Sequence, residues 1–404
     1  MTGQNLTSLD DALSHLLARA RVVTQTCILP LHQTLGRVLA ADVAVPADVP
    51  PADNSAVDGY ALRASDVAEH PVLPVSARVA AGEPPGELTP GTAVRIFTGS
   101  EIPAGADAVV MQERTETRDN SIAVTATVDT GQNIRRQGQD LKQGNIALHA
   151  GTPIRPQEMG LLGSMGIGEV VVLRRLKVAV FSTGDELVEP GQPLQPGQIY
   201  NTNRFTLTGL LEAAGCEVTR CETLRDERDA TRDGLLAAAA EADLIITSGG
   251  VSVGEEDHVR AVLEDNGQLS LWRLAIKPGK PLAFGAIADT PVLGLPGNPV
   301  AVLVTFLVAG LPYIRHCQGN RRYHPLGEPL AADFKVDKPS IRREFLRARK
   351  ETGPDGVTVT AFPNQSSGVL SSACWGDGLA VVPENTSVTQ GDIIRYYSFS
   401  ELLG

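Results

Sequence analysis

The feature of this sequence that most constrains its fold is an alternation of apolar and amphipathic runs that starts at Lys177. The apolar runs have the length and β-branched composition of buried strands; they are Lys177–Phe181, Asp243–Thr247 and the residues around Leu282 and Val292. The amphipathic runs predict helices over Arg204–Ala214, with Asn203 as its cap and Gly215 at its end, over Arg228–Glu241, after Asp257 and after Pro299. This alternation predicts a central α/β domain with a mostly parallel sheet.

Open sheets of this class bind ligands at the carboxyl ends of their strands, so we expect the chemistry in the loops after Phe181, Thr247 and Leu295. The second of these loops begins with Ser248–Gly250, where glycine lets backbone amides approach a phosphate closely. A tight turn without a ligand explains a Gly-Gly pair equally well. The acidic run that ends at Asp257 favours the first interpretation, because Mg²⁺ is commonly held between carboxylates and phosphate oxygens.

Further charged loops are expected at the same edge of the sheet. Glu186, in the loop after Phe181, adds a carboxylate, whereas Asp226 is on spacing alone more typical of a turn or a helix cap. The segment Ile276–Pro281 displays two lysines on a backbone restricted by proline and glycine, which suits an oxyanion or phosphate. A solvated turn is the alternative for that segment. A plain helix start is the alternative for Leu295–Pro299.

The regions on either side of this domain have a different pattern, with proline and glycine between short β-branched runs. Between about Val43 and Gly144, runs such as Thr92–Phe97 and Ile122–Val128 predict a β-rich, barrel-like inserted domain. The stretch Pro325–Gly404 predicts a small C-terminal β-barrel or sandwich.

The remaining segments are expected to be helical or to join the domains. Leucines at helical spacing from Leu9 to Leu17, behind Ser8 as a cap, predict a first helix. Pro156 predicts the start of a short helix and Glu169–Leu173 predicts a strand, and we expect this segment to pack back on the first helix. Four domains follow: residues 1–44 with 145–174, the insertion 45–144, the α/β domain 175–322 and the C-terminal β domain 323–404.

Composition and charge exclude several classes of protein. With 42% hydrophobic and 20% charged residues the chain is not expected to be disordered. A net charge of −12 disfavours nucleic acid and acidic membranes as partners. The longest apolar run, Val300–Leu311, is shorter than the roughly 20 residues of a membrane-spanning helix, and no signal pattern begins the chain. We expect a cytoplasmic protein whose five cysteines are reduced, since their spacing matches no metal or redox motif.

Polar motifs in the β-rich regions are, each by itself, most typical of turns or of solvent-facing strands. They are Asp53–Ala61, Arg95–Gly99, Asn133–Asp140, Arg342–Arg347 and Gln365–Gly368. Taken in order with the loops above, seven motifs resemble those of the molybdopterin molybdenumtransferase family, which is related to the E domain of gephyrin. These motifs are Asn54–Tyr60, Thr98–Gly99, Asn133–Asp140, Ser182–Leu187, Ser248–Asp257, Lys277–Pro281 and Leu295–Pro299.

The resemblance implies a transferase that moves molybdenum from molybdate to adenylyl-molybdopterin. Mg²⁺ would assist the release of AMP, and molybdenum cofactor would be the product. The resemblance also implies an elongated homodimer, in which the inserted and C-terminal domains of one subunit face the α/β domain of the other. An adenylyltransferase of the same pathway is the implied protein partner. No protein nucleophile is needed, because water or a molybdate oxygen attacks phosphorus and the dithiolene sulfurs belong to the substrate.

Site residues follow from the resemblance motif by motif. The metal-binding and catalytic acids would be Glu186, Asp226 and Asp257, with Lys277 as a further catalytic residue. The second subunit would supply Asp58, Thr98, Arg135 and Asp140. The phosphates, the pterin and molybdate would be bound by Ser248, Gly249, Gly250, Ser252, Lys280, Pro281, Pro296, Pro299, Arg347 and Ser367. Lysine, arginine and hydroxyl donors are the expected partners of a doubly charged oxyanion.

Two other functions fit the same fold. A non-catalytic molybdopterin-binding scaffold or carrier would be expected to lack the acids, but Glu186, Asp226 and Asp257 are present. A nucleotide-processing hydrolase built on the same α/β domain would lack the β-rich insertion, which is present with its motifs. Arg273 departs from the family's pattern, where lysine is common, and changes the donor geometry while preserving the charge. Tungstate is an alternative oxyanion of nearly the same size and charge.

Overall fold

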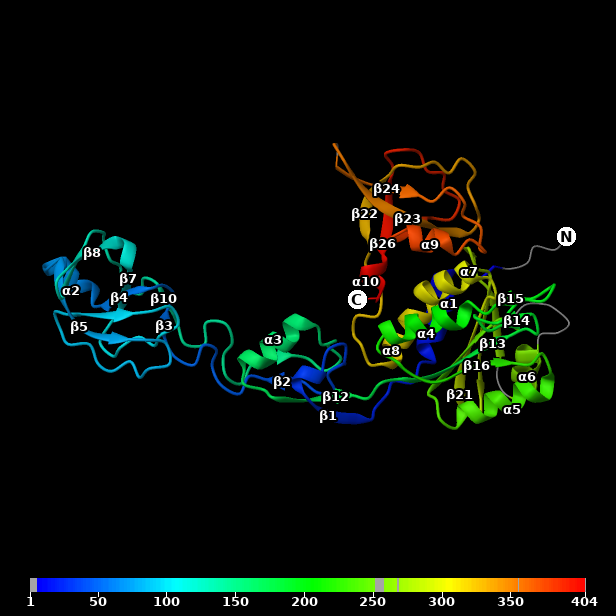
Figure 1. Ribbon diagram of the computed structural model, residues 1–404, viewed down its shortest axis with the longest axis horizontal. Coiled ribbons are helices and arrows are strands. Elements are labelled where there is room, and N and C mark those ends of the chain that lie inside the picture. The colour runs from blue at the N-terminus through cyan, green and yellow to red at the C-terminus, as the bar shows by residue number, and fades with distance from the viewer. Residues whose placement is uncertain (1–5, 251–257, 267–268, 355, 404) are drawn as a thin grey trace.

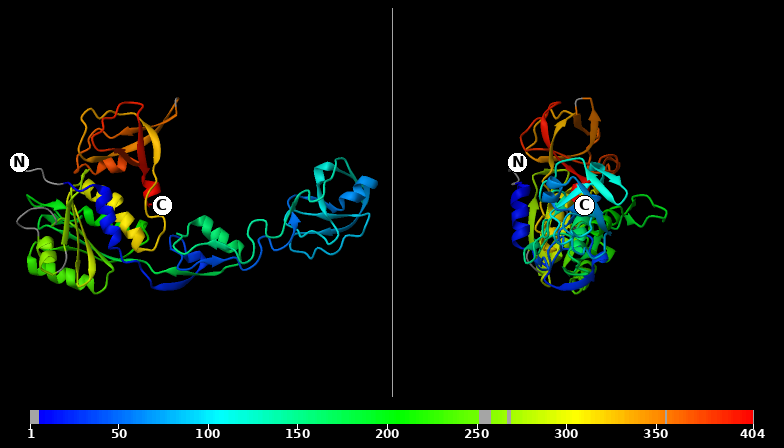
Figure 2. Two further views of the ribbon diagram at one scale, coloured as in Figure 1. Left: turned by 180° about the vertical axis from the view of Figure 1, so that it is seen from behind. Right: turned by 90° about the vertical axis from the view of Figure 1, so that its left-hand side faces the viewer.

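The computed structural model describes residues 6–250, 258–266, 269–354 and 356–403. The chain is elongated (Figures 1 and 2). The β-rich insertion lies at one end, and a narrow segment of paired strands with one helix follows it. The α/β domain, with the C-terminal β domain beside it, forms the other end. The residue boundaries given above for the four domains stay a prediction.

The α/β domain is built on a six-stranded sheet in the order β16-β13-β17-β21-β20-β18. The strands are, in that order, Glu217–Leu224, Lys177–Thr183, Leu244–Ser248, Thr290–Leu295, Pro281–Ile287 and Leu269–Arg273. The first four strands pair in parallel, and β20 pairs antiparallel with both β21 and β18, so β20 alone runs against the others and the predicted mostly parallel sheet is confirmed. The apolar runs of the central strands are buried, as expected for a sheet that helices cover on both faces.

Helices cover both faces of this sheet. One apolar core joins the sheet to α1, α4, α7 and α8, and a second core joins it to α5 and α6. The bounds are α1 (Leu9–Ala18), α4 (Asn203–Ala213), α5 (Arg228–Ala239), α6 (His258–Asn266), α7 (Pro299–Thr305) and α8 (Leu311–Cys317), with the π-helix η3 (Phe306–Gly310) between the last two. The predicted helices are therefore present, but the N-cap residue of α4 is Thr202 and not Asn203.

The first helix belongs to the core of the α/β domain. Ser8 caps it as predicted, because the Ser8 Oγ accepts a hydrogen bond from the Asp11 N–H at 3.0 Å. The leucine face of α1 packs against α8. The expectation that residues 145–174 pack back on this helix is wrong, since they form a separate core with β1 (Thr26–Pro30) and β2 (Val43–Ala44). An apolar helix face fits either surface, and only the path of the chain selects one.

Helices α7 and α8 form one continuous apolar stretch, Pro299–Cys317. By length and composition alone it could cross a membrane, but 83% of its most apolar window is buried inside the protein. Its side chains lie in the same apolar core as those of the sheet, α1 and α4. In this fold it is therefore a core helix.

The narrow segment between the two ends consists of two strand pairs and α3 (Pro156–Ser164). Strand β1 pairs antiparallel with β12 (Glu169–Leu173), and β2 pairs antiparallel with β11 (Ile146–Leu148). One strand of each pair precedes the insertion in sequence and the other follows it, so the chain leaves and returns along the same path (Figure 1). The predicted helix at Pro156 and the predicted strand Glu169–Leu173 are confirmed.

The start of α3 is held by an interaction that depends on pH. Glu158 is 7% exposed and accepts hydrogen bonds from the Arg155 N–H at 2.9 Å and from the Arg155 guanidinium at 2.5 and 3.0 Å. The guanidinium of Arg155 holds the pKa of the Glu158 carboxyl below its ordinary value. Because the pKa is lowered by folding, the ionised carboxylate stabilises α3 at neutral pH. That stabilisation is lost as the pH falls through the folded-state pKa.

We expect Glu158→Gln to lower the local stability of α3 by about 1–2 kcal/mol at pH 7, because it removes a charged cap. Hydrogen exchange of the α3 amides, corrected for the intrinsic rate at each pH, measures the difference from the wild type. The difference should shrink as the pH falls below the ordinary carboxyl range. Glu169→Gln, at an exposed glutamate of the same segment, is the control and should change little. A difference that is the same at every pH would contradict this role of Glu158.

The β-rich insertion folds around an open six-stranded sheet in the order β7-β4-β6-β5-β9-β8. The strands are, in that order, Ala108–Met111, Gly59–Leu62, Ala93–Ile96, Val72–Val79, Ser121–Val124 and Thr115–Arg118. The outer strands β7 and β8 do not pair with each other in this fully described region, so the sheet is half a barrel. The remaining elements are α2 (Ala64–Glu69) and the strand pair β3 (Asn54–Ser55) with β10 (Ile134–Arg135). The predicted β-rich insertion is thus confirmed as a half barrel.

The C-terminal domain is a closed five-stranded β-barrel. Its strands are β22 (Glu328–Ala332), β23 (Arg343–Gly353), β24 (Gly356–Ala361), β25 (Gly378–Val382) and β26 (Ile393–Ser398), with the short helices α9 (Ser371–Trp375) and α10 (Phe399–Leu403). Strand β23 pairs with both β24 and β25, which closes the ring and confirms the predicted barrel. Strand β19 (Ile276–Lys277), which lies just before β20 in the chain, also pairs with β23. This pairing fixes the barrel beside the carboxyl edge of the large sheet.

Candidate functional site

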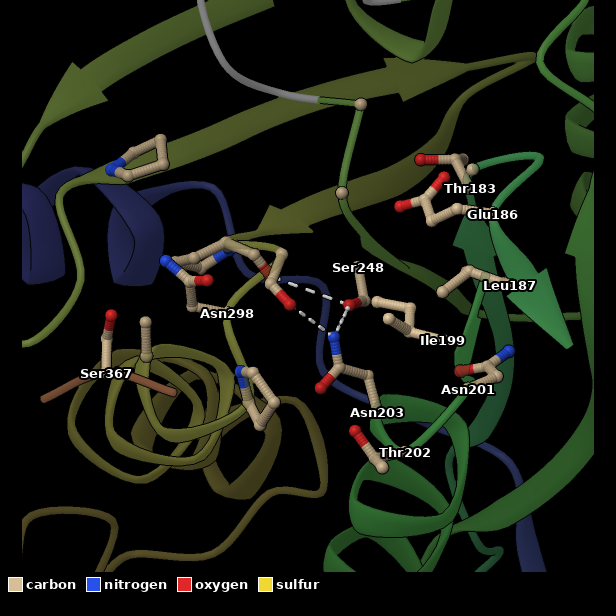
Figure 3. Close-up of a pocket in the computed structure, with 18 of the residues that line it drawn as sticks. Thr183, Glu186, Leu187, Ile199, Asn201, Thr202, Asn203, Ser248, Asn298 and Ser367 are labelled. Atoms are coloured by element: carbon tan, nitrogen blue, oxygen red, sulfur yellow. Dashed lines mark hydrogen bonds between the residues drawn. The ribbon is translucent and has the colours of Figure 1, made fainter. Parts of the chain in front are cut away.

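A cleft of about 910 Å³ lies at the carboxyl ends of the parallel strands, between the α/β domain and the C-terminal barrel (Figure 3). The loops predicted from the strand ends at Phe181, Thr247 and Leu295 all line it. At its rim, β14 (Leu187–Val188) and β15 (Ile199–Tyr200) form a short parallel pair. A volume of this size suits a ligand of cofactor dimensions.

Two glycines continue β17 into the cleft. Gly249 and Gly250 follow Ser248 with φ values of +90° and +66°, in the left-handed region that favours glycine. A Cβ on Gly249 would lie 2.8 Å from the Thr183 Oγ1, so any other residue would push this loop away from the end of β13. The glycine loop Ser248–Gly250 therefore lies directly against the neighbouring strand end.

The two acids Glu186 and Asp226 line the cleft from adjacent loops. Glu186 folds back over Gly184, where a side chain would collide with its carboxylate. The Asp226 N–H donates a hydrogen bond to the Asp185 Oδ1 at 3.2 Å, which joins the loop after β16 to the loop after β13. The His258 Nε2 lies 3.9 Å from the Asp226 Oδ1. The neighbouring positions of β13 and β16 in the sheet thus place both predicted acids in the lining of one cleft.

The third predicted acid, Asp257, and Ser252 lie outside the described residues. Among the residues that are described, no group of three or more His, Cys, Asp or Glu side chains is arranged to hold a metal ion. The carboxylates that the described part of the cleft offers to a cation are therefore those of Glu186 and Asp226.

The cations that line the cleft in the described structure are Lys280, in the loop before β20, and Arg342, just before β23. Neither forms an ion pair within the described ranges of the chain. The hydroxyl-bearing Ser367 lies on the same barrel side, with Pro281 nearby in the lining. The sequence indicated Arg342 only as part of a charged strand. Because it lines the cleft, it is a further candidate for the site.

Arg347, which the resemblance places at the pterin and molybdate, is fully buried and does not line the cleft. Its guanidinium donates hydrogen bonds to the Ser372 Oγ at 3.0 Å and to the carbonyls of Ser366 and Phe345 at 3.3 and 3.4 Å. Burial lowers the pKa of this guanidinium to about 10. Arg347 holds the loop that carries Ser367, and its predicted place beside the pterin and molybdate stays a prediction. The strand that carries Arg347 is largely buried, so the interpretation of this strand as solvent-facing is wrong.

Lys277 does not line the cleft either. Its Nζ lies 3.2 Å from the Oε1 of Glu344, whose side chain is almost fully buried. The parallel pairing of β19 with β23 places these two residues side by side. Strand pairing therefore directs Lys277 to the junction between the sheet and the barrel. Of the two lysines in this segment Lys280 lines the cleft in the described structure, and the predicted role of Lys277 stays a prediction.

The four residues expected from a second subunit lie in the β-rich insertion. The Asp58 Oδ1 accepts hydrogen bonds from the Thr98 N–H and Oγ1, both at 2.8 Å, and these bonds lower the pKa of the Asp58 carboxyl. Arg135 and Asp140 are exposed near β10. The insertion lies at the opposite end of the chain from the cleft (Figure 1). The structure thus brings Asp58 and Thr98 together but separates all four from the cleft of the same chain.

The other predicted binding residues, Pro296 and Pro299, line the cleft as expected. Residues that the sequence interpretation missed include Asn201, Asn203 and Asn298. The pattern around Asn203 indicates a helix cap, but its side chain bonds residues of the cleft (Figure 3). A usable signal was present for two of them, because the polar run Asn201–Asn203 stands at the start of α4.

Comparison with known proteins covers the whole of this architecture. The MoeA N-terminal region (domain I and II) matches residues 7–166, the probable molybdopterin binding domain matches 179–316, and the MoeA C-terminal region (domain IV) matches 329–399. A molybdopterin molybdenumtransferase of Haemophilus influenzae is 43% identical over 402 residues, which are 98% of this chain and 100% of the relative. The chain belongs to the molybdopterin molybdenumtransferase family.

Further members of the molybdopterin molybdenumtransferase family agree. One from a Nostoc species is 42% identical over 371 residues, covering 89% of this chain and 85% of that protein. A crystal structure of the molybdopterin biosynthesis moeA protein from Pyrococcus horikoshii is 30% identical, with a TM-score of 0.83 over 98% of this chain and 100% of that one. All regions of the fold described above thus have counterparts in the family.

Proposed function

We propose that this protein is the transferase that inserts molybdenum into molybdopterin during molybdenum cofactor biosynthesis. The relatives that this chain matches over most of their length are named molybdopterin molybdenumtransferases. The substrates would be molybdate and adenylyl-molybdopterin, and the products would be molybdenum cofactor and AMP. One observation carries the proposal. The acids Glu186 and Asp226 line the same cleft as the cations Lys280 and Arg342, with the acids on loops after β13 and β16, Lys280 before β20 and Arg342 before β23 of the barrel.

The cationic side of the cleft suits molybdate. Molybdate is a doubly charged tetrahedral oxyanion, and Lys280, Arg342 and the Ser367 hydroxyl supply donors of the required kind. A chain with a net charge of −12 repels anions at long range, so molybdate needs local cations that have no carboxylate partner. The loop that carries Ser367 is held in place by the buried Arg347 through the Ser366 carbonyl.

The acidic side of the cleft suits the adenylate. The glycine loop Ser248–Gly250 offers close backbone approach to the phosphates. Glu186 and Asp226 fit one Mg²⁺, since this ion commonly takes one or two carboxylates together with substrate phosphate oxygens and water. When bound, Mg²⁺ would neutralise the charge that develops as the pyrophosphate bond breaks. Through that ion, Glu186 and Asp226 would hold the phosphates in a fixed position relative to the residues that bind molybdate.

A second copy of the chain would complete the site. The β-rich insertion lies at the opposite end of the molecule from the α/β domain (Figure 2), so the predicted residues Asp58, Thr98, Arg135 and Asp140 would contribute from another subunit. Thr98 already fixes the orientation of the Asp58 carboxylate, which is what a preorganised binding group requires. The homodimer, the cytoplasmic location and an adenylyltransferase that delivers the substrate are the parts of the proposal that rest on the resemblance to the family.

The test is a reaction of the purified protein with adenylyl-molybdopterin, Mg²⁺ and molybdate. We expect AMP to be released together with an equal amount of cofactor, measured by the activation of a cofactor-free molybdenum enzyme. Omission of molybdate or of Mg²⁺ should stop cofactor formation. Tight binding of the adenylate without AMP release would instead support the carrier function. Replacement of molybdate by tungstate tests which oxyanion the cleft prefers.

A further inference from the structure

Two asparagines at the start of α4 connect the strand ends that surround the cleft. Asn201 is 1% exposed. Its Oδ1 accepts a hydrogen bond from the Ser182 Oγ at 3.2 Å, and its Nδ2 donates to the Thr223 Oγ1 at 3.1 Å. Ser182 lies in β13 and Thr223 lies in β16. Asn201 therefore joins the two strands whose loops carry Glu186 and Asp226.

Asn203 makes the corresponding connection on the other side. Its Nδ2 donates to the Ser248 Oγ and to the Gly297 carbonyl, both at 2.7 Å (Figure 3). Ser248 is the last residue of β17, and Gly297 lies in the loop after β21. In the sheet the four strands are neighbours in the order β16-β13-β17-β21. Together the two asparagines thus span all four parallel strand ends.

The hydrogen bonds of Asn203 join the chain at the edge where the strand pairing of the sheet ends. The ladder between β17 and its neighbours ends at the pairs Ser182 with Ser248 and Ser248 with Leu295. Beyond these pairs one more backbone hydrogen bond joins the Gly249 N–H to the Leu295 carbonyl at 3.2 Å, and the glycine loop Ser248–Gly250 and the loop Pro296–Pro299 then line the cleft next to each other. The Asn203 amide ties the beginnings of these two loops to each other through side-chain hydrogen bonds.

The orientation of the Asn203 amide is determined by its partners. The Gly297 carbonyl only accepts hydrogen bonds, so the amide nitrogen must face it. Both hydrogens of that nitrogen are then used within the protein. The Oδ1 is buried and has no hydrogen-bond partner among the described residues. Buried polar atoms are rarely left in this state, and departures from best stability concentrate at functional sites.

We propose that Asn203 is a positioning residue that sets the spacing of the glycine loop from the Pro296–Pro299 loop. The inference rests on the proposed function, because it assigns the phosphates of the adenylate to the glycine loop. Asn203 acts through Ser248 and Gly297, since both of its donors are occupied by them. Its loss should therefore disturb the phosphate end of the cleft and leave the molybdate end, at Lys280, Arg342 and Ser367, unchanged.

Asn203→Asp is the sharpest test, because the carboxylate keeps the shape of the amide but cannot donate to the Gly297 carbonyl. AMP and molybdate are the probes. The dissociation constant of each is measured with the purified full-length protein in the oligomeric state that it adopts in solution. We expect the Kd for AMP to rise at least about tenfold and the Kd for molybdate to stay within about twofold. Hydrogen exchange should become faster in the segments 244–250 and 297–304 and stay unchanged in the barrel.

Two further variants keep the test decisive. Asn203→Ala removes the same hydrogen bonds without adding charge, so it stands in for Asn203→Asp if that variant does not fold. Asn320→Ala is the control: it removes an asparagine whose Oδ1 accepts a hydrogen bond from the Arg322 N–H at 2.7 Å outside the cleft. The control should leave both dissociation constants unchanged.

The outcomes separate this inference from the proposed function. Unchanged AMP binding and unchanged exchange in a folded Asn203 variant would overturn the positioning role. Equal weakening of AMP and molybdate would also overturn it, since a general structural role would produce that result. Failure of the wild type to release AMP from adenylyl-molybdopterin would instead overturn the proposed function, while the exchange measurement would still decide whether Asn203 orders these two loops.

Discussion

Asp226→Asn is expected to slow the Mg²⁺-dependent release of AMP from adenylyl-molybdopterin by about 10²–10³-fold. Asp226 lines the cleft, and its backbone N–H is bonded to the loop that carries Glu186. The amide keeps the size of the side chain but removes the negative charge that a divalent cation requires. The rate of AMP release at a series of Mg²⁺ concentrations measures the effect, and the variant should need more Mg²⁺ than the wild type.

A nearby aspartate provides the matched control for this prediction. Asp229 lies three residues further along, on α5, with a largely exposed side chain paired to Arg232, and it does not line the cleft. Asp229→Asn should therefore release AMP at the wild-type rate with the wild-type Mg²⁺ dependence. Wild-type behaviour of Asp226→Asn, or equal loss in the two variants, would remove Asp226 from the proposed metal site.

Arg342→Met is expected to weaken molybdate binding and Arg347→Met is expected to destabilise the barrel, although the two arginines are only five residues apart. Arg342 lines the cleft, so its loss should raise the Kd for molybdate about 10- to 100-fold and leave the barrel folded. Arg347 is buried and bonds the Ser366 and Phe345 carbonyls and the Ser372 hydroxyl. Its loss leaves these acceptors buried without a donor, which should destabilise the barrel by about 2–4 kcal/mol.

Molybdate binding by calorimetry and denaturant unfolding of the barrel measure these two effects separately. Arg349→Met serves as the control, because Arg349 is a half-exposed arginine of the same strand that pairs with Glu351. It should change neither quantity much. If Arg347→Met lost molybdate binding while remaining as stable as the wild type, Arg347 would bind the oxyanion and not only hold the barrel.

Much of the fold could be predicted because its elements repeat over several residues. The leucine spacing behind Ser8, the strand at Glu169–Leu173 and the alternation after Lys177 all appear where they were expected. Periodicity predicts which face of an element is buried, but not which surface buries it. For this reason the partner of α1 was predicted wrongly, and the half barrel of the insertion could not be distinguished from a closed one.

The candidate site could be predicted only in part. The strand-end loops that carry Glu186, Ser248 and Pro296 were found because parallel strands bring their carboxyl ends together. Arg342 was overlooked, and the burial of Arg347 and the pairing of Lys277 with Glu344 were not foreseen, because all three depend on the barrel in or against which these residues lie. Neither charge nor spacing in the sequence indicates that β19 pairs with β23.

The sequence by itself determined the kinds of elements, the order of the domains and the family, since each depends on local pattern or on motifs that stand in a fixed order. The tertiary structure decided which charged side chains are free for a ligand and which are used by the protein. Arg342 lines the cleft whereas Arg347 is enclosed. That difference arises from pairings between distant segments of the chain. They place one arginine at the cleft and the other inside the barrel, although the two are close in sequence.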